Sequence, residues 1–324
     1  MKNFSGPFSK DLTEHILLKQ SIGYNYNTEE CILVQFDNFT KEMYPDAKSL
    51  TKEITVEWCS KRSYESKGNQ ASRVSALRQF TLYLDRIGKP AWVIPKCFCP
   101  KGDKYIPHIY TSDELQRFFR ETDKCHVVSI CPYRHLVMPL FFRLIYSCGL
   151  RCSEARLLKI NDVDFENGIL TIRESKNDNS RLVPMTEDMH KRCIEYFNSI
   201  QRLSYDGDWF FPGRGNRPLT LGNVYKNFRK FLFNAGIPHR GRGQGPRVHD
   251  FRHTYACNCL KKWISDSKDL NVYLPILKTY MGHNALEDTA YYLRLTADVY
   301  ADISSVLDTK FNDIIPSRAG DSSD

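Results

Sequence analysis

Four short segments of the chain carry residue types suited to chemistry on a phosphate group. They are Gly149–Glu154, a turn around Lys176, His249–Thr254 and Met281–His283, and Tyr292 follows the last of them nine positions later. Arginine presents a planar fork of donors to phosphate oxygens and stays charged at any ordinary pH. A tyrosine hydroxyl can attack a phosphodiester and hold the product as a covalent ester. These residue types are those that phosphoryl transfer through a tyrosine nucleophile with arginine support would use.

Spacing decides which of these side chains can act together. His249 and Arg252 stand three residues apart, so both lie on one face if the segment is helical, and both can then address one phosphate. Tyr292 stands nine residues after His283, and the adjacent Tyr291 is the alternative tyrosine. For His253 we favour a structural role in packing or capping.

In this order the segments resemble the tyrosine recombinase (phage integrase) family. Gly149–Glu154 is similar to its G-L-R-x-S-E box and His249–Thr254 to its H-x-x-R-H-T box. Gly282–His283 with Tyr292 is similar to its G-H box and nucleophile, and the interval from Lys176 to Pro184 matches its catalytic hairpin. The resemblance covers roughly residues 108–310. It fits an integrase or transposase of a mobile element as well as an Xer-like or Cre-like recombinase.

The resemblance implies a role for each side chain. Arginines would stabilise the pentacoordinate phosphate, a lysine would protonate the leaving oxygen, and histidines would transfer a proton or bind the phosphate. The implied catalytic residues are Arg151, Lys176, His249, Arg252, His283 and the nucleophile Tyr292, with Glu154 orienting the basic groups.

The activity implied by the resemblance is site-specific DNA recombination, expected to serve the integration or excision of a mobile element. Strands are cut and rejoined through a 3′-phosphotyrosyl intermediate and a Holliday junction. No cofactor is expected, neither metal nor ATP, because the tyrosyl ester stores the bond energy. The expected partners are double-stranded DNA recombination sites and a homo-tetramer on DNA, with the apolar tail after Tyr292 docking in cis or in trans. A directionality factor is a further candidate partner.

Other functions remain open at this stage. A type IB topoisomerase, a telomere resolvase or a resolvase of chromosome or plasmid dimers would share the chemistry. A DNA-binding accessory protein that has lost catalysis would share the fold only. Each motif alone has an ordinary interpretation, such as a solvated loop cation for Arg151 or an exposed turn for Lys176.

Two domains must position these residues. Helical periodicity predicts a helical core-binding (SAM-like) DNA-binding domain at 1–97, with Ser49 or Thr51 capping its third helix. A segment at 98–107 is predicted as a linker, and 108–324 as a mainly helical catalytic domain. Three short strands, expected at 163–165, 169–172 and 181–185, give this domain a small antiparallel sheet. The fold class is therefore mainly α with an α+β catalytic domain.

The charge distribution favours an anionic partner. The 324 residues carry 46 Lys and Arg against 38 Asp and Glu, a formal net charge of +8. Basic residues gather on the later helices of the first domain and around the Gly-rich stretch 236–247, where they can neutralise DNA phosphates. The predicted DNA contacts are Arg62, Lys67, Arg73, Arg78, Lys226, Arg229, Lys230, Arg240, Arg242 and Arg247.

Composition excludes several other classes of protein. No run of 18 apolar residues is present, so a spanning helix is not expected, and the first 20 residues lack the pattern of a secretory signal. The eleven cysteines include no C-x-x-C pair, so we expect reduced thiols and no metal site, although the pairs Cys97/Cys99 and Cys257/Cys259 allow a zinc interpretation. The expected location is the cytoplasm, in association with DNA.

Overall fold

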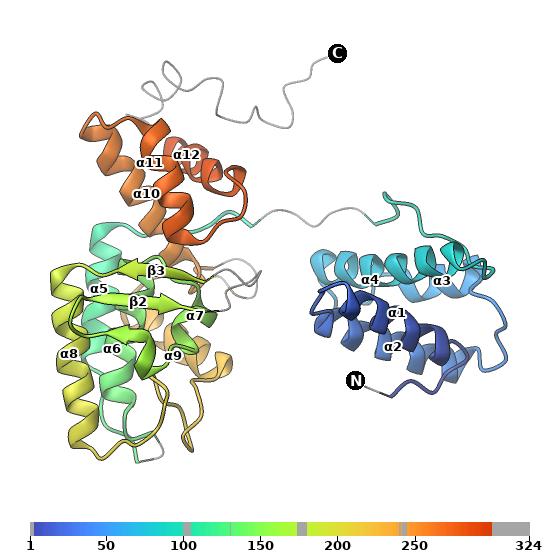
Figure 1. The fold of residues 1–324 in the computed structure, drawn as a ribbon, viewed down its shortest axis with the longest axis horizontal. Coiled ribbons are helices and arrows are strands. Elements are labelled where there is room, and N and C mark those ends of the chain that lie inside the picture. The colour runs from blue at the N-terminus through green and yellow to red at the C-terminus, as the bar shows by residue number, and fades with distance from the viewer. Residues whose placement is uncertain are drawn as a thin grey trace. The chain divides into compact units, whose positions relative to one another are not determined.

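The chain divides into two compact units, Met1–Lys104 and Tyr105–Asp324, at a point inside the segment predicted as a linker (Figure 1). The computed structural model describes residues 3–99, 105–129, 131–173, 180–239, 241 and 245–299. Both units are mainly helical, and the second contains a small antiparallel sheet, which confirms the predicted fold class. No helix in the described part of the chain is long and apolar enough to cross a membrane.

The first unit packs its helices around one apolar core. Its helices are α1 (Ser9–Ser21), α2 (Asn27–Met43), α3 (Lys52–Cys59) and α4 (Lys67–Arg86). Thr51, one of the two predicted caps, accepts a hydrogen bond from the backbone N–H of Ile54, and Ser66 caps α4 in the same way. Leu12, Phe36 and Phe80 are fully buried between the helices. Burial of these apolar side chains thus holds the four helices together.

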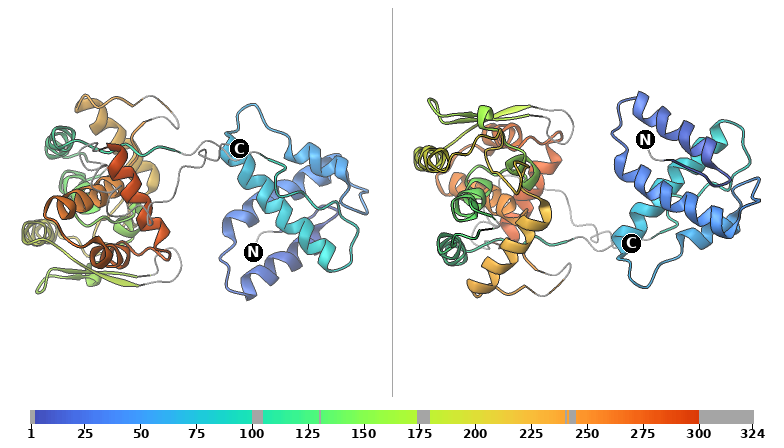
Figure 2. Two further views of the ribbon diagram at one scale, coloured as in Figure 1. Left: turned by 90° about the horizontal axis from the view of Figure 1, so that it is seen from above. Right: turned by 90° about the horizontal axis from the view of Figure 1, so that it is seen from below.

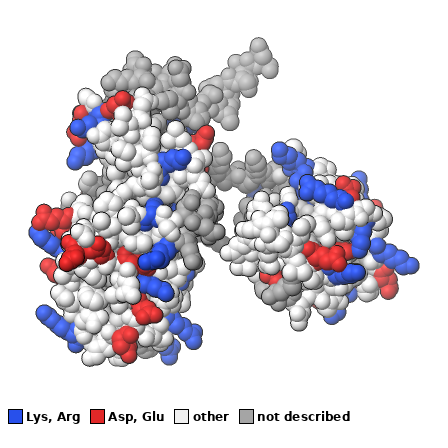
Figure 3. Space-filling model, in the orientation of Figure 1, with Lys and Arg blue, Asp and Glu red and all other residues white. Residues whose placement is uncertain are grey.

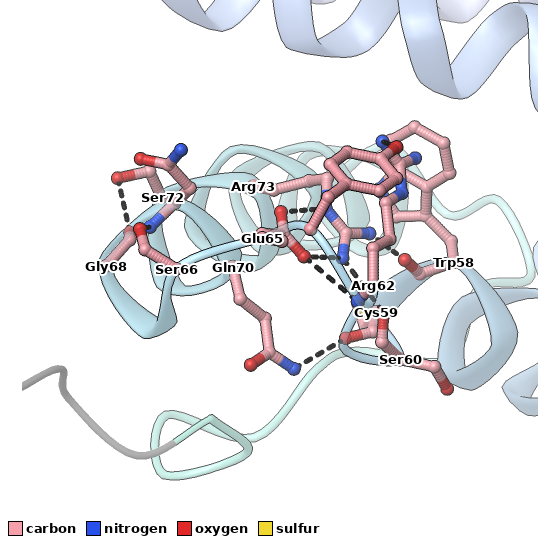
Figure 4. Close-up of polar contacts among 12 residues, drawn as sticks. Trp58, Cys59, Ser60, Arg62, Glu65, Ser66, Gly68, Gln70, Ser72 and Arg73 are labelled. Carbon is pink, nitrogen blue, oxygen red and sulfur yellow. Dashed lines mark hydrogen bonds and ion pairs between the residues drawn. The ribbon is translucent and has the colours of Figure 1, made fainter. Parts of the chain in front are cut away.

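The buried side chain of Arg73 in α4 holds the end of α3 and the connection that follows it. The side chain of Arg73 donates to both carboxylate oxygens of Glu65, at 2.9 and 2.8 Å, and to the carbonyl oxygens of Trp58 and Ser60 (Figure 4). Arg73 is only 3% exposed. The prediction that Arg73 contacts DNA is therefore wrong, because its donors are already engaged inside the protein.

The second unit begins with a capped helix and builds a larger core. Its helices are α5 (Ser112–Asp123), α6 (Arg134–Ser147), α7 (Cys152–Arg156), α8 (Glu187–Arg202), α9 (Leu221–Asn234), α10 (Asp250–Ser265), α11 (Leu270–Met281) and α12 (Glu287–Val299). Thr111 and Glu114 form a capping box at the start of α5. Phe118, Phe142, Phe228 and Phe251 bring α5, α6, α9 and α10 into contact in the core.

A short hairpin sheet follows α7. A 3-10 turn (Ile160–Asp162) leads into β1 (Val163–Asp164), and β2 (Ile169–Ile172) pairs antiparallel with both β1 and β3 (Arg181–Pro184). The predicted strands match these bounds to within one residue. Gly168 has a φ of +67°, as the tight turn between β1 and β2 requires. The strands lie at one edge of this unit in both views of Figure 2.

Helices α10, α11 and α12 share a smaller apolar cluster. Leu260, Leu274, Leu277 and Leu293 are buried in it, and so is the ring of Tyr292. Phe251, in the first turn of α10, belongs instead to the main core. Helix α10 therefore connects the two clusters, and its first turn is fixed from both sides.

Candidate active site

The position of Arg151, the first arginine of the site, depends on the tight turn that ends α6. Gly149 has a φ of +58°, and a Cβ built on it would lie 2.7 Å from the ring of Tyr255, so no other residue fits there without displacement. Two residues on, Arg151 precedes α7 and its Nη1 donates to Glu154 at 2.7 Å. Its Nη2 donates to the carbonyl oxygen of Gly282 at 2.9 Å, 131 positions away.

The second arginine comes from the first turn of α10. His249 has helical backbone angles directly before the helix, so His249 and Arg252 share that turn, as the spacing predicts. Arg252 is 1% exposed and donates to the carbonyl oxygens of Gly149 at 2.6 Å and Met281 at 2.5 Å. Arg151 and Arg252 thus both contact the backbone of the segment Met281–His283, and Arg252 also contacts that of Gly149–Glu154.

The end of α11 supplies a histidine. Gly282 adopts the left-handed conformation that ends the helix, with a φ of +66°. His283 follows, and its Nδ1 lies 2.9 Å from the hydroxyl of Thr289 in α12. Its ring stacks on that of Tyr292, with centroids 5.8 Å apart. The hydrogen bond and the stacking fix the orientation of the imidazole.

Burial distinguishes the two adjacent tyrosines. Tyr292 is 3% exposed and points into the site, whereas Tyr291 is 42% exposed. The ring of Tyr292 packs against His253 as well as His283, and its hydroxyl interacts with Arg252. Burial raises the pKa of Tyr292 to about 12, with Arg252 acting in the opposite direction. The geometry therefore favours Tyr292, in a protonated form at neutral pH.

The site holds more positive than negative charge. Three guanidinium groups, those of Arg151, Arg181 and Arg252, surround the carboxylate of Glu154, at 2.7, 2.9 and 4.0 Å. Burial lowers the pKa of Arg252 to about 10, and the charge of Arg151 acts in the same direction. Such a cluster is stable only at a cost in folding free energy, and a bound anion would relieve it.

The histidines of the site are neutral at pH 7. Burial, reinforced by the charge of Arg252, lowers the pKa of His283 to about 4. The same two causes lower the pKa of His249, although part of this residue stays exposed. The pKa of His253 falls to about 3, from the same desolvation and from His249. A neutral imidazole can accept a proton, which suits a general base close to a tyrosine.

Two residues of the site were not predicted as functional. Arg181 was noted only as part of the hairpin, yet its side chain reaches Glu154. His253 was assigned a structural role, but its ring lies 5.5 Å from that of Tyr292 and 4.8 Å from that of His249. The R-H pair at 252–253 placed His253 one residue from a predicted catalytic arginine, and this was the available signal.

Several predicted residues lie outside the described part of the chain. These are Lys176, Arg240 and Arg242, together with the tail after Val299. Among the other predicted DNA contacts, Arg62 lies over the ring of Trp58 and Arg78 donates to the carbonyl oxygen of Ile94. The remaining ones are exposed: Lys67, Lys226, Arg229, Lys230 and Arg247. On the faces drawn in Figure 3, basic side chains are interspersed with acidic ones.

The cysteines form no disulfide among the described residues, where all eleven are free. Within the same ranges, no group of three or more His, Cys, Asp or Glu side chains has the arrangement of a metal site. The pairs Cys97/Cys99 and Cys257/Cys259 thus lack further ligands there for the zinc interpretation.

Comparisons with known proteins agree with this geometry. The profile of the phage integrase family matches residues 109–298. A putative integrase/recombinase of Sinorhizobium fredii, y4rB, is 29% identical over 316 residues, which cover 94% of this chain and 98% of the relative. The tyrosine recombinase XerC of Chromobacterium violaceum is 30% identical over 229 residues, 69% of each chain.

Solved structures show the same fold. The XerH site-specific recombinase in a post-cleavage complex with a palindromic difH substrate superimposes with a TM-score of 0.62 at 21% identity. The match covers 87% of this chain and 79% of the XerH chain. The Tn1549 transposon integrase bound to circular intermediate DNA gives a TM-score of 0.61 at 14% identity. The match covers 87% of this chain and 94% of the integrase chain. The chain therefore belongs to the phage integrase family and is a tyrosine-type site-specific DNA recombinase.

Proposed function

We propose that Tyr292 is the nucleophile that cleaves one strand of a recombination site and remains attached to its 3′ phosphate. The observation that supports this most directly is the convergence of Tyr292, Arg151, Arg252 and His283, which come from four segments of the second unit. The bond from phosphorus to the tyrosine oxygen forms as the bond to the 5′ oxygen breaks. The freed 5′-hydroxyl then attacks a partner strand, which leads to a Holliday junction.

The arginines are proposed to bind the phosphate, and the histidines to accept a proton or donate a hydrogen bond. Arg151 and Arg252 bind the non-bridging oxygens and stabilise the charge that develops on them. His249, neutral at pH 7, accepts the proton of Tyr292, and His283 donates a hydrogen bond to the phosphate. Lys176 protonates the leaving 5′ oxygen, a role that stays a prediction because Lys176 lies outside the described residues.

We propose further that the reaction needs neither a metal ion nor ATP. Two arginines supply the positive charge that a metal would otherwise provide, and the tyrosyl ester conserves the energy of the broken bond. Cleavage in a chelator such as EDTA should therefore proceed at an unchanged rate. A rate restored only by added Mg²⁺ would contradict this.

The biological role that we propose is integration or excision of a mobile element. The likeness to a putative integrase/recombinase along nearly the whole chain supports it, as does the fold shared with a transposon integrase. The DNA substrate is double-stranded and is bound by a homo-tetramer across two sites. The docking of the tail after Val299 and the need for a directionality factor remain predictions, since the tail lies outside the described residues.

The test is covalent trapping on DNA from the borders of the element that encodes the protein. A nicked duplex that loses the short leaving strand prevents religation, so an adduct that survives SDS accumulates. We expect an adduct with the natural protein and with Tyr291→Phe, and none with Tyr292→Phe. An adduct that survives Tyr292→Phe would overturn the assignment of the nucleophile.

A second assay separates recombination from relaxation. A type IB topoisomerase would relax any supercoiled plasmid without a defined site. We expect relaxation or strand exchange only on plasmids that carry the recombination site. Equal relaxation of plasmids with and without the site would identify topoisomerase chemistry instead.

A further inference from the structure

Arg181 links three elements around the site. It is the first residue of β3, and its side chain is 7% exposed. Nη1 and Nη2 donate to the two carboxylate oxygens of Glu154, both at 2.9 Å, and Nε donates to the carbonyl oxygen of Tyr280 at 2.8 Å. The paired geometry is the strongest form of an arginine–carboxylate contact. Arg181 thereby joins the β2–β3 hairpin to α7 and to the end of α11.

Glu154 is shared between Arg181 and the two arginines proposed to bind phosphate. Its carboxylate also accepts from Nη1 of Arg151 at 2.7 Å and from the backbone N–H of Arg151 at 2.8 Å. Burial alone would raise the pKa of Glu154, but the hydrogen bond and charge of Arg181 outweigh it and hold the pKa at about 2. Among its neighbours, Arg181 alone engages both carboxylate oxygens through its side chain.

The turn before His283 is shaped to admit Arg181. A Cβ on Gly282 would lie 2.9 Å from Nη1 of Arg181, so a side chain at position 282 would push the guanidinium away. The carbonyl oxygen of Gly282 accepts from Nη2 of Arg151 at 2.9 Å. The same turn therefore contacts Arg181 and Arg151, and the absence of a side chain at position 282 lets both approach.

These contacts define what the loss of Arg181 would do. With Arg181 present, one carboxylate faces three cations, and it accepts two hydrogen bonds from Arg181 and two from Arg151. Without Arg181, Glu154 would keep its full charge beside Arg151 and Arg252, and Arg252 lies only 4.0 Å away. Coulomb attraction in a poorly solvated site would then draw Arg252 toward the carboxylate and strengthen the existing 2.7 Å contact of Arg151, so both arginines would be held away from a phosphate.

We propose that Arg181 is a positioning residue that balances the charge of Glu154 and so limits the pull of this carboxylate on Arg151 and Arg252, the two arginines proposed to bind the scissile phosphate. Arg181 does not itself touch the reacting atoms. The proposal rests on the function proposed above. It assigns to the start of β3 a role in catalysis beyond that of a structural strand.

The test compares Arg181→Met with a matched control, Arg173→Met, in the full-length protein. Arg173 lies just after β2 on the same hairpin and pairs with Asp162, but its side chain is 64% exposed and contacts no member of the site. Each variant is assayed for cleavage of a nicked duplex with an ordinary phosphodiester at the cleavage position. A second duplex carries a methylphosphonate there, which lacks one negative charge and needs less cationic support.

We expect Arg181→Met to cleave the phosphodiester about 100-fold more slowly, the size of effect seen when a transition-state donor is displaced. On the methylphosphonate the loss should be about tenfold smaller, since the demand for positive charge is lower. Arg173→Met should match the natural protein on both substrates. An equal loss on both substrates would mean that Arg181 only holds the hairpin in place and would overturn the proposal, as would no loss at all.

A double variant makes the test independent of folding defects. Glu154→Gln removes the charge that Arg181 is proposed to balance, so Arg181→Met with Glu154→Gln should cleave faster than Arg181→Met alone. Additive losses would contradict the proposal. If the natural protein forms no adduct on either duplex, the proposed function itself fails, and this outcome is distinct from every result above.

Discussion

Arg73 in the first unit and Arg252 in the second are both almost fully buried, but only Arg73 forms a close ion pair with a carboxylate. Arg73 is paired with Glu65 through two hydrogen bonds, and the pKa of Glu65 is lowered chiefly by that contact. Arg252 donates to two carbonyl oxygens and interacts with the hydroxyl of Tyr292, and it lies 4.0 Å from a carboxylate that Arg181 already engages. A buried charge that is balanced supports the fold, whereas a buried charge in excess marks a place for an anion.

The largest effect is expected for Arg252→Met. Cleavage should fall by about 1,000-fold or more, because a donor to the transition state is lost. Thermal stability should stay the same or rise, because burial and neighbouring cations already disfavour the charge of Arg252. The two measurements are the rate of adduct formation and the midpoint of thermal unfolding. A large drop in the midpoint would indicate that Arg252 serves the fold as Arg73 does.

The converse change is Arg73→Met. It should destabilise the first unit by about 3 kcal/mol, because Glu65 is left buried without its partner. Hydrogen exchange should accelerate in α3 and α4 but not in α10. Arg62→Met is the matched control, since Arg62 contacts the same Trp58 ring without an ion pair. If Arg73→Met left exchange unchanged and abolished DNA binding, the original prediction of a DNA contact would be right after all.

A comparison of two glycines isolates the steric requirement of the site. Gly149→Ala should slow cleavage about tenfold, because strain of 1–2 kcal/mol in a left-handed residue adds to the clash with Tyr255. Gly88, which ends α4, has a φ of +73° but nothing within 4 Å of a built Cβ. Gly88→Ala should therefore carry the backbone strain alone and leave the cleavage rate unchanged. Equal rates for the two variants would show that the contact with Tyr255 is unimportant.

The smallest effect concerns pH. The pKa of His253 lies at about 3 against an ordinary 6.5, so protons bind more tightly to the unfolded chain. The stability that neutral His253 provides is thus complete above pH 6.5 and declines as the pH falls toward 3. His15 in the first unit, with a pKa of about 4, acts in the same direction.

His253→Gln should therefore reduce the drop in unfolding midpoint between pH 7 and pH 5 without removing it. Circular dichroism melts at both pH values measure this. A drop of the same size in His253→Gln and in the natural protein would mean that His253 does not contribute.

Much of the active site and of the hairpin was predictable from the sequence, because local spacing patterns determine both. The spacing from His249 to Arg252 and the interval from His283 to Tyr292 follow from one helical turn and one short connection, and both place the residues together. The hairpin strands follow from β-branched runs with a turn at Gly168. Family motifs supplied the order of the segments.

The partners of the arginines were not predictable, because they depend on tertiary contacts. A motif marks Arg252 and none marks Arg73, but nothing in the sequence shows that Arg73 pairs with Glu65 or that Arg252 lies 4.0 Å from Glu154. Arg181 lies 27 positions from Glu154, and no local pattern connects the two. Charge counts indicate a DNA-binding protein but do not separate a structural arginine from one that binds phosphate.

The most direct test of the account is to locate the covalent bond. The adduct formed on a nicked duplex is digested with a nuclease and a protease, and the peptide that retains a nucleotide is sequenced by mass spectrometry. We predict a nucleotide joined through its 3′ phosphate to the hydroxyl of Tyr292, buried beside Arg252. A nucleotide on Tyr291, on any other residue, or joined through a 5′ phosphate would contradict it.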